Sequence, residues 1–379
     1  MSFLSRTDKS LIGSWFWTVD RTMLMAVFIL IGYGAVLVAA ASPSVATRIG
    51  LPEHHFLFRH LVILVVSVAG MIFVSFLSPK GLWRLATVVL GAGIFAMVLI
   101  PFVGMEIKGA QRWIHIPGLS LQPSELVKPA FAIVAARFIS MQKEKENFPG
   151  EMYAAILFAV IVVLLMMQPD FGMTFVVTCI AVSQIFLAGC RFKYLIYVGI
   201  AGVTALLVVY SSFGHVQSRI DRFLDPESGN NYQVEKSLES FKQGGVMGVG
   251  PGQGTVKLSL PDAHADFIFA VSGEELGFLF TVLLAGIYLF IVMHGFRKME
   301  DSEDMFSILA CGGILTMFGL QAFIHMGSSL HLLPAKGMTL PFISYGGTSL
   351  LSIGFAMGAV LSLTRHKKRT GIVSKRTHR

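Results

Sequence analysis

The chain has 379 residues, of which 54% are hydrophobic and only 14% are charged. Soluble domains carry roughly a quarter charged residues, so this composition excludes an ordinary soluble protein and predicts an all-α, polytopic membrane protein. The net charge of +8 comes from short basic clusters between apolar runs and from the C-terminal residues. This distribution is typical of membrane topology signals and differs from the basic stretches with interleaved aromatic residues that bind nucleic acid, so it argues against nucleic-acid binding.

Apolar runs of about 20 residues, the length that crosses a bilayer as a helix, recur about ten times along the chain. We expect one integral membrane unit over residues 1–379 and no separate soluble domain. The expected spans are 21–41, 60–78, 84–104, 122–140, 152–168, 171–189, 193–213, 267–294, 305–327 and 346–364.

Basic residues indicate orientation because they concentrate in cytoplasmic loops. With the N-terminus in the cytoplasm, 12 basic residues outside the tail and seven in the tail, 19 of the 30, fall on the inner side. We therefore expect a cytoplasmic N-terminal segment over 1–20 and a basic cytoplasmic tail over 365–379. The longest connection, 214–266 between the seventh and eighth spans, is expected outside. Loops of this length are commonly functional.

Charged residues beside the early spans are candidates for a site, since a charge near the bilayer centre costs roughly 2.5–3.5 kcal/mol. Arg112 precedes Trp113, an expected membrane-interface anchor. Glu125 and Lys128 share one helix face and can pair, either to hold the bundle or to serve a site. Asp170 joins two spans, where it can cap the second helix or line a cavity.

The stretch LPDAHADFIFAVSGEELG, residues 260–277, places charge where the long loop enters the eighth span. Asp262, His264 and Asp266 precede the apolar run. A carboxylate is favoured at a helix N-terminus for structural reasons. The same position, where water meets the membrane, also suits a base that reaches a hydroxyl of a membrane-bound substrate. The residues alone leave both interpretations open.

Glu274 and Glu275 lie inside the eighth span, and we expect them to hydrogen-bond neighbouring helices as structural residues. The glycine-rich run GGVMGVGPGQG, residues 244–254, predicts a tightly turning loop. Nucleotide binding is not indicated, because no strand precedes the run and no Gly-Lys-Ser/Thr follows it.

Five motifs recur in order over some 240 residues: KGAQRWIHIPGLSLQPSELVK at 108–128, QPDFGM at 168–173, the glycine-rich run, the stretch 260–277, and LLPAKGMTLPFISYGGTSL at 332–350. With these motifs the chain resembles the SEDS family (shape, elongation, division and sporulation), the polytopic proteins that include FtsW and RodA. The forms PDAHADF and LLPAKGMTLPFISYGG are more similar to FtsW. Ala265 departs from the Thr that is common at its position.

The resemblance implies a peptidoglycan glycosyltransferase, a hexosyltransferase of cell wall synthesis in division. Its substrate would be lipid II, a disaccharide-pentapeptide on undecaprenyl diphosphate, polymerised outside the bacterial cytoplasmic (inner) membrane. It also implies a class B penicillin-binding protein as partner, together with other divisome proteins at the septum.

The resemblance implies roles for particular residues as well. The family's essential aspartate, in the motif His-x-Asp-Phe, corresponds to Asp266, the expected general base. We expect cationic side chains to stabilise the diphosphate. The candidate substrate-binding residues are Arg112, Glu125, Lys128, Asp170, His264 and Lys336. No metal-ligand cluster or certain cofactor is evident, although Mg²⁺ or Mn²⁺ suits a diphosphate substrate.

Three alternatives stay open: a lipid II flippase, a RodA-like elongation polymerase, and a scaffold that only recruits the synthase. The polar motifs gather on the expected outer face. A reaction site can be one-sided, whereas alternating access in transporters uses sites near the bilayer midplane, between repeats. This distribution favours an enzyme.

Overall fold

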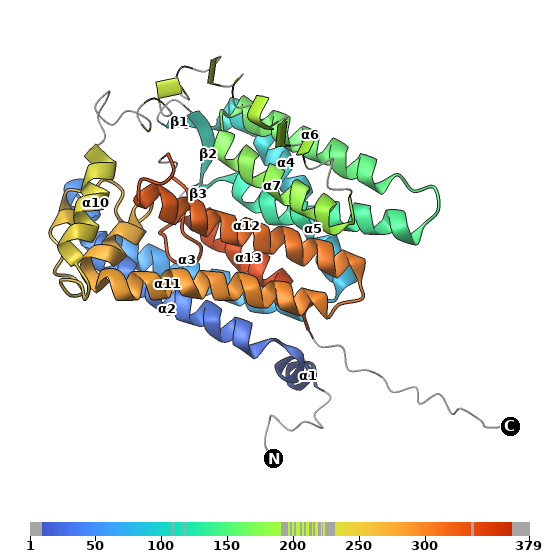
Figure 1. Cartoon of the computed structure of the whole chain (residues 1–379), viewed down its shortest axis with the longest axis horizontal. Helices are drawn as coiled ribbons and strands as arrows, with labels where there is room; N and C mark the ends of the chain where they lie inside the picture. The colour runs from blue at the N-terminus through green and yellow to red at the C-terminus, as the bar shows by residue number, and fades with distance from the viewer. Residues whose placement is uncertain are drawn as a thin grey trace.

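The computed structural model describes residues 10–107, 110–116, 119–190, 232–334 and 337–365, with individual positions between 196 and 223. Its architecture is a bundle of long helices that run up and down between two ends (Figure 1). The all-α prediction is confirmed, because the described strands form one small sheet outside the helical layers.

Within the described residues, nine of the ten expected spans coincide with helices. The seventh, 193–213, lies largely outside them. The helices are α2 (Arg21–Arg48), α3 (His55–Phe76), α4 (Pro79–Val103), α5 (Pro123–Glu144), α6 (Gly150–Met167), α7 (Phe171–Leu187), α11 (Ile268–Glu300), α12 (Met305–Ser329) and α13 (Gly347–Leu363). Six of these, all but α5, α7 and α13, are long and apolar enough to cross a membrane.

Side-chain caps explain where several helices begin. Asp20 accepts the backbone N–H of Met23 at the start of α2, and Ser78 precedes Pro79 at the start of α4. Such oxygen acceptors satisfy N–H groups that have no partner inside the helix. These caps break the apolar runs into separate helices with short connections.

Six described elements were not predicted, three helical and three strands. The segment 1–20 contains the short helix α1 (Leu11–Thr18), and the loop 214–266 contains α10 (Tyr232–Gly244) and the 3-10 turn η2 (Val256–Leu258). The connection before α5 folds into an antiparallel sheet of β1 (Met105–Ile107), β2 (Ala110–Ile116) and β3 (Leu119–Leu121), in the order β1-β2-β3. All of them except α10, which has 13 residues, are too short for hydrophobic periodicity to reveal.

The connections sort to two ends of the bundle. We call the end that carries β1–β3 and α10 the loop end, and the end that carries α1 and the last residues of α13 the tail end (Figure 1). At the tail end, Arg365 donates to Thr18 and to the backbone of α3. The two described termini therefore lie together. Their side of the membrane stays a prediction, and residues 366–379 of the basic tail lie outside the described residues.

The core of the bundle is formed by α5, α12 and α13, whose residues are buried on nearly every face. The outer helices α3, α4 and α6 bury one stripe and expose large apolar side chains on the other. An apolar outer surface of this kind is what lipid tails cover. The protein is thus a multi-pass membrane protein with a protein-filled centre.

Candidate functional site

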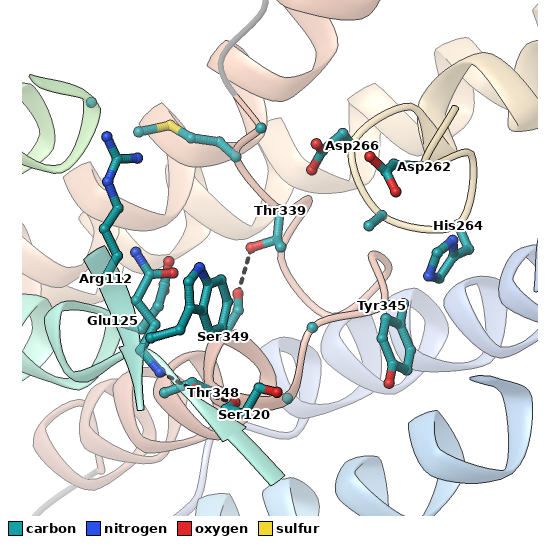
Figure 2. Close-up of a pocket in the computed structure, with 18 of the residues that line it drawn as sticks. Arg112, Ser120, Glu125, Asp262, His264, Asp266, Thr339, Tyr345, Thr348 and Ser349 are labelled. Atoms are coloured by element: carbon teal, nitrogen blue, oxygen red, sulfur yellow. Dashed lines mark hydrogen bonds between the residues drawn. The ribbon is translucent and has the colours of Figure 1, made fainter. Parts of the chain in front are cut away.

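A cavity of about 760 Å³ opens among the segments of the loop end. Its wall brings together β2, the N-terminal turns of α5 and α7, the turn before α11, and the segment that leads into α13. Five predicted site residues line it, although they are far apart in sequence: Arg112, Glu125, Asp170, His264 and Asp266. Figure 2 shows Arg112 on one side of the cavity and Asp266 on the other.

Arg112 is held at its side of the cavity by the turn between α6 and α7. Its guanidinium donates to the backbone carbonyl of Gln168 at 3.0 Å and to that of Pro169. It also lies 3.7 Å from the carboxylate of Asp170. About a third of the Arg112 side chain stays exposed, so it can face a bound anion.

Asp170 combines the two interpretations that its sequence context left open. Its carboxylate caps α7 by accepting the backbone N–H of Met173 at 3.2 Å. The same carboxylate lines the cavity and accepts a long, 3.5 Å hydrogen bond from the side chain of Gln122. It is therefore a structural cap that also orients Arg112.

The Glu125–Lys128 ion pair forms as its spacing predicted, with 2.9 Å between Oε2 and Nζ. Glu125 lines the cavity, but Lys128 is fully buried and lies outside the wall. The expectation that Lys128 contacts a diphosphate directly is therefore not supported. A buried ammonium needs its partner, so Lys128 instead pairs with Glu125 from behind the wall and holds its carboxylate in place.

The turn before α11 presents Asp262 and Asp266 on one side of the cavity (Figure 2). The backbone N–H of Asp266 donates to the carbonyl of Asp262 at 3.0 Å, which closes the turn. The hydroxyl of Ser344 donates to the carbonyl of Ala265 at 2.7 Å. Gly337 lies against Asp266: a Cβ there would stand 3.2 Å from the aspartate Oδ2.

His264 points away from Asp266 into an aromatic cluster. Its ring lies 4.6 Å from that of Phe56 and 5.0 Å from that of Tyr345, between centroids. Burial lowers the pKa of His264 to about 4, and the nearby Asp262 carboxylate opposes this shift. The imidazole is therefore neutral near pH 7 and supports the turn by packing.

Several lining residues were missed by sequence reasoning: Arg59, Gln122, Thr339, Tyr345 and Ser349. Four of them lie inside the quoted motifs, which were the available signal. Arg59 had none, because it lies at the start of an apolar span. Trp113, expected at the membrane interface, also lines the cavity. Lys336 lies outside the described residues.

The arrangement separates two kinds of chemistry. On one side of the cavity, Asp262 and Asp266 supply carboxylates that can accept a proton. On the other side, Arg112 supplies a cation that can stabilise negative charge. In the part of the chain that the structure describes, no three His, Cys, Asp or Glu side chains converge as a metal cage. A cavity of this kind can activate a hydroxyl and stabilise an anionic leaving group.

Comparison with known proteins agrees with this architecture. The FtsW/RodA/SpoVE family model, described as "Cell cycle protein", matches residues 21–369. The chain is similar to the probable peptidoglycan glycosyltransferase FtsW of Caulobacter vibrioides, with 37% identity over 97% of this chain and 94% of the relative. It is also similar to the protein of that name from Coxiella burnetii, with 35% identity over 92% of this chain and 96% of the relative.

Two solved structures share the fold. One is a chain of a peptidoglycan synthase complex, studied for the structural coordination of polymerization and crosslinking. It has a TM-score of 0.76 and 25% identity, and the match covers 91% of this chain and 97% of that chain. The other is the rod shape determining protein RodA of Thermus thermophilus. Its TM-score is 0.68 at 26% identity, over 91% of this chain and 96% of that one.

Proposed function

Because the chain belongs to the FtsW/RodA/SpoVE family, we propose that it is a peptidoglycan glycosyltransferase that polymerises lipid II for the septal wall. The observation that carries the proposal is the cavity at the loop end, which Asp266 and Arg112 line from opposite sides. Relatives that match this chain over nearly their whole length are named as probable peptidoglycan glycosyltransferases of the FtsW type. This similarity favours a division enzyme over a RodA-like elongation polymerase.

The reaction joins a sugar hydroxyl of one lipid II molecule to the anomeric carbon of another. Asp266 accepts the hydroxyl proton as the new carbon–oxygen bond forms and the bond to the diphosphate breaks. A positioned general base contributes typically 100- to 10,000-fold. One carboxylate suffices for this direct displacement, so the anomeric configuration inverts.

The diphosphate leaves with additional negative charge, which needs cationic stabilisation rather than a proton. Arg112 supplies it, because two backbone carbonyls hold its guanidinium in place beforehand. A guanidinium matches phosphate oxygens with paired N–H donors. Lys336, outside the described residues, is a further candidate.

A divalent cation fits this site as a companion of the diphosphate. Mg²⁺ is commonly bound by substrate phosphates with one or two protein carboxylates. Asp170 and Glu125, which line the cavity on the side of Arg112, are the carboxylates that could join it. The ion would neutralise charge on the diphosphate.

The proposal includes location and partners. The enzyme acts at the outer face of the cytoplasmic membrane, with both termini in the cytoplasm, at the division septum. A class B penicillin-binding protein crosslinks the strands, and other divisome proteins recruit the pair. The similarity to a chain of a solved peptidoglycan synthase complex supports such a partnership.

The test replaces Asp266 by Asn, which keeps the shape of the side chain and removes its basicity. We expect purified Asp266→Asn protein, with its penicillin-binding partner, to polymerise lipid II at least 100-fold more slowly than the parent, in keeping with loss of a general base. The measurement is the rate of glycan-strand formation on a gel.

Asp301→Asn is the matched control, since it makes the same charge change at the exposed tail end of α11. It should leave the rate unchanged. Equal rates for the parent and Asp266→Asn would remove the proposed base. Transfer of labelled lipid II across liposomes by a parent that forms no polymer would favour a flippase.

A further inference from the structure

Helix α11 is interrupted at Gly277, about two and a half turns after its first residue. Its backbone there has φ 77° and ψ −178°, a conformation outside the helical region that glycine adopts readily. The interruption separates a half-helix, residues 268–276, from the long remainder, residues 278–300. Asp266 lies immediately before the half-helix, so the orientation of this short piece decides where the carboxylate points.

The backbone groups released by the interruption are satisfied by the glycine segment, residues 244–250. Its N–H groups at Val249 and Gly250 donate to the carbonyls of Glu274 and Glu275 at 3.0 and 2.9 Å. Its carbonyl at Gly245 accepts the N–H of Phe278 at 2.9 Å. The segment therefore connects the two halves of α11.

Contact between the half-helix and the glycine segment requires the absence of side chains. A Cβ on Gly248 would lie 2.2 Å from the carbonyl oxygen of Glu275, and a Cβ on Gly277 would lie 2.2 Å from the nitrogen of Gly248. Both glycines also have positive φ. The glycines of this run therefore allow its backbone to pack directly against the interrupted part of α11.

Three buried charges then tie the half-helix to the rest of the loop end. The carboxylate of Glu274 accepts the N–H groups of Val256 and Lys257 at 2.7 and 2.9 Å. The ammonium of Lys257 pairs with the carboxylate of Glu275 and donates to the carbonyl of Ala40 on α2 at 2.9 Å. Lys257, Glu274 and Glu275 are each at most 4% exposed.

We propose that Lys257 and Glu275, with Glu274, are positioning residues that hold Asp266 in its catalytic orientation by fixing the half-helix to α2. This inference rests on the proposed function of the site. None of the three lines the 760 Å³ cavity, so they act through Asp266 rather than on the substrate. Misplacing a catalytic group by about 1 Å can slow a reaction about 100-fold.

The charged pair is a better probe than either partner alone, because removing one leaves a buried charge without its partner. Lys257→Met combined with Glu275→Gln removes both charges and keeps similar volumes. We expect this double variant to stay folded and to bind lipid II with a KM within about twofold of the parent value. Its kcat should fall 10- to 100-fold, the range for a displaced catalytic group.

Two further variants separate positioning from general stability. Lys257→Arg, made alone in the parent, keeps the positive charge. It should retain most of the parental kcat, unlike the double variant. Gly248→Ala leaves every charge in place but pushes the glycine segment away from Glu275, and should lower kcat like the double variant. Lys236→Met, which breaks the exposed Lys236–Glu239 pair on α10, should leave kcat and KM unchanged.

The measurements are kcat and KM for lipid II polymerisation with the partner present, together with thermal unfolding of each purified protein in detergent. A folded double variant with parental kcat would overturn the inference. So would a double variant that recovers parental kcat once assayed below its lowered unfolding temperature. An inactive parent would count against the proposed function itself, which keeps the two failures distinct.

Discussion

His264 and Asp266 are separated by one residue, yet the fold places them in opposite environments. Both residues contribute to the cavity wall, but the imidazole of His264 is buried against the rings of Phe56 and Tyr345. The segment is a turn closed by the hydrogen bond from the Asp266 N–H to the Asp262 carbonyl, so the two side chains do not share one face as they would in an extended chain. The motif therefore serves two purposes: His264 anchors the turn by packing, and Asp266 presents a carboxylate to the cavity, where the proposed function needs a base.

The buried histidine predicts a pH dependence of stability. The pKa of His264 falls from 6.5 to about 4 on folding, so the unfolded chain binds more protons between these values. Stability is then complete above about pH 6.5 and is lost as the pH falls towards 4. From pH 7 to pH 5 this residue should lower the free energy of unfolding by about 2 kcal/mol.

The measurement is unfolding in detergent at pH 7 and pH 5, for the parent and for His264→Gln. Glutamine does not titrate, so the variant should be less stable at pH 7 but lose less stability on acidification. All other titrating groups are common to both proteins. An identical pH dependence of stability in the parent and in His264→Gln would show that His264 is not buried in its neutral form.

At the scale of the element, α3 and α13 pack closely through small residues. A Cβ on Gly354 would lie 2.4 Å from the hydroxyl of Ser67, and one on Gly358 would lie 2.6 Å from the carbonyl oxygen of Met71. The two glycines are four residues apart and share one face of α13. This spacing lets helix backbones approach closely inside a membrane.

Gly358→Ala should therefore destabilise the bundle by roughly 1–3 kcal/mol, the usual effect of overpacking. The measurement is the thermal unfolding temperature in detergent. Gly70→Ala is the matched control on α3, since no atom lies within 4 Å of its added Cβ. Alanine favours helix there, so this control should equal or exceed the parent. Equal stability of both variants would contradict the close packing.

At the scale of the whole molecule, the motif residues that line the cavity all lie at the loop end of the bundle. The tail end carries the connections in which we counted most of the basic residues. Cytoplasmic loops hold the excess of Lys and Arg in membrane proteins. The loop end is therefore predicted to face outwards, which agrees with the proposed polymerisation at the outer face of the membrane.

Labelling of single introduced cysteines in intact cells tests this orientation. Met247→Cys, on the exposed glycine segment, should react with a membrane-impermeant maleimide. Glu146→Cys, exposed between α5 and α6, should react only after the membrane is permeabilised. The parent, whose three cysteines are native, gives the background. The reverse pattern would invert the proposed topology.

The sequence by itself determined the membrane class, the position of most helices, the Glu125–Lys128 pair and the motifs that surround the cavity. These features depend on local properties: apolar length, helix spacing and capping residues. Such signals survive in the sequence because each involves residues that are near one another along the chain.

Only the tertiary structure decided which motif residues meet. It placed Lys128 behind the cavity wall, turned His264 into an aromatic cluster, and added Arg59 to the lining. It also showed that Glu274 and Glu275 bind the preceding loop instead of neighbouring helices. Burial and long-range pairing depend on how distant segments pack, and no periodicity within one segment encodes that packing.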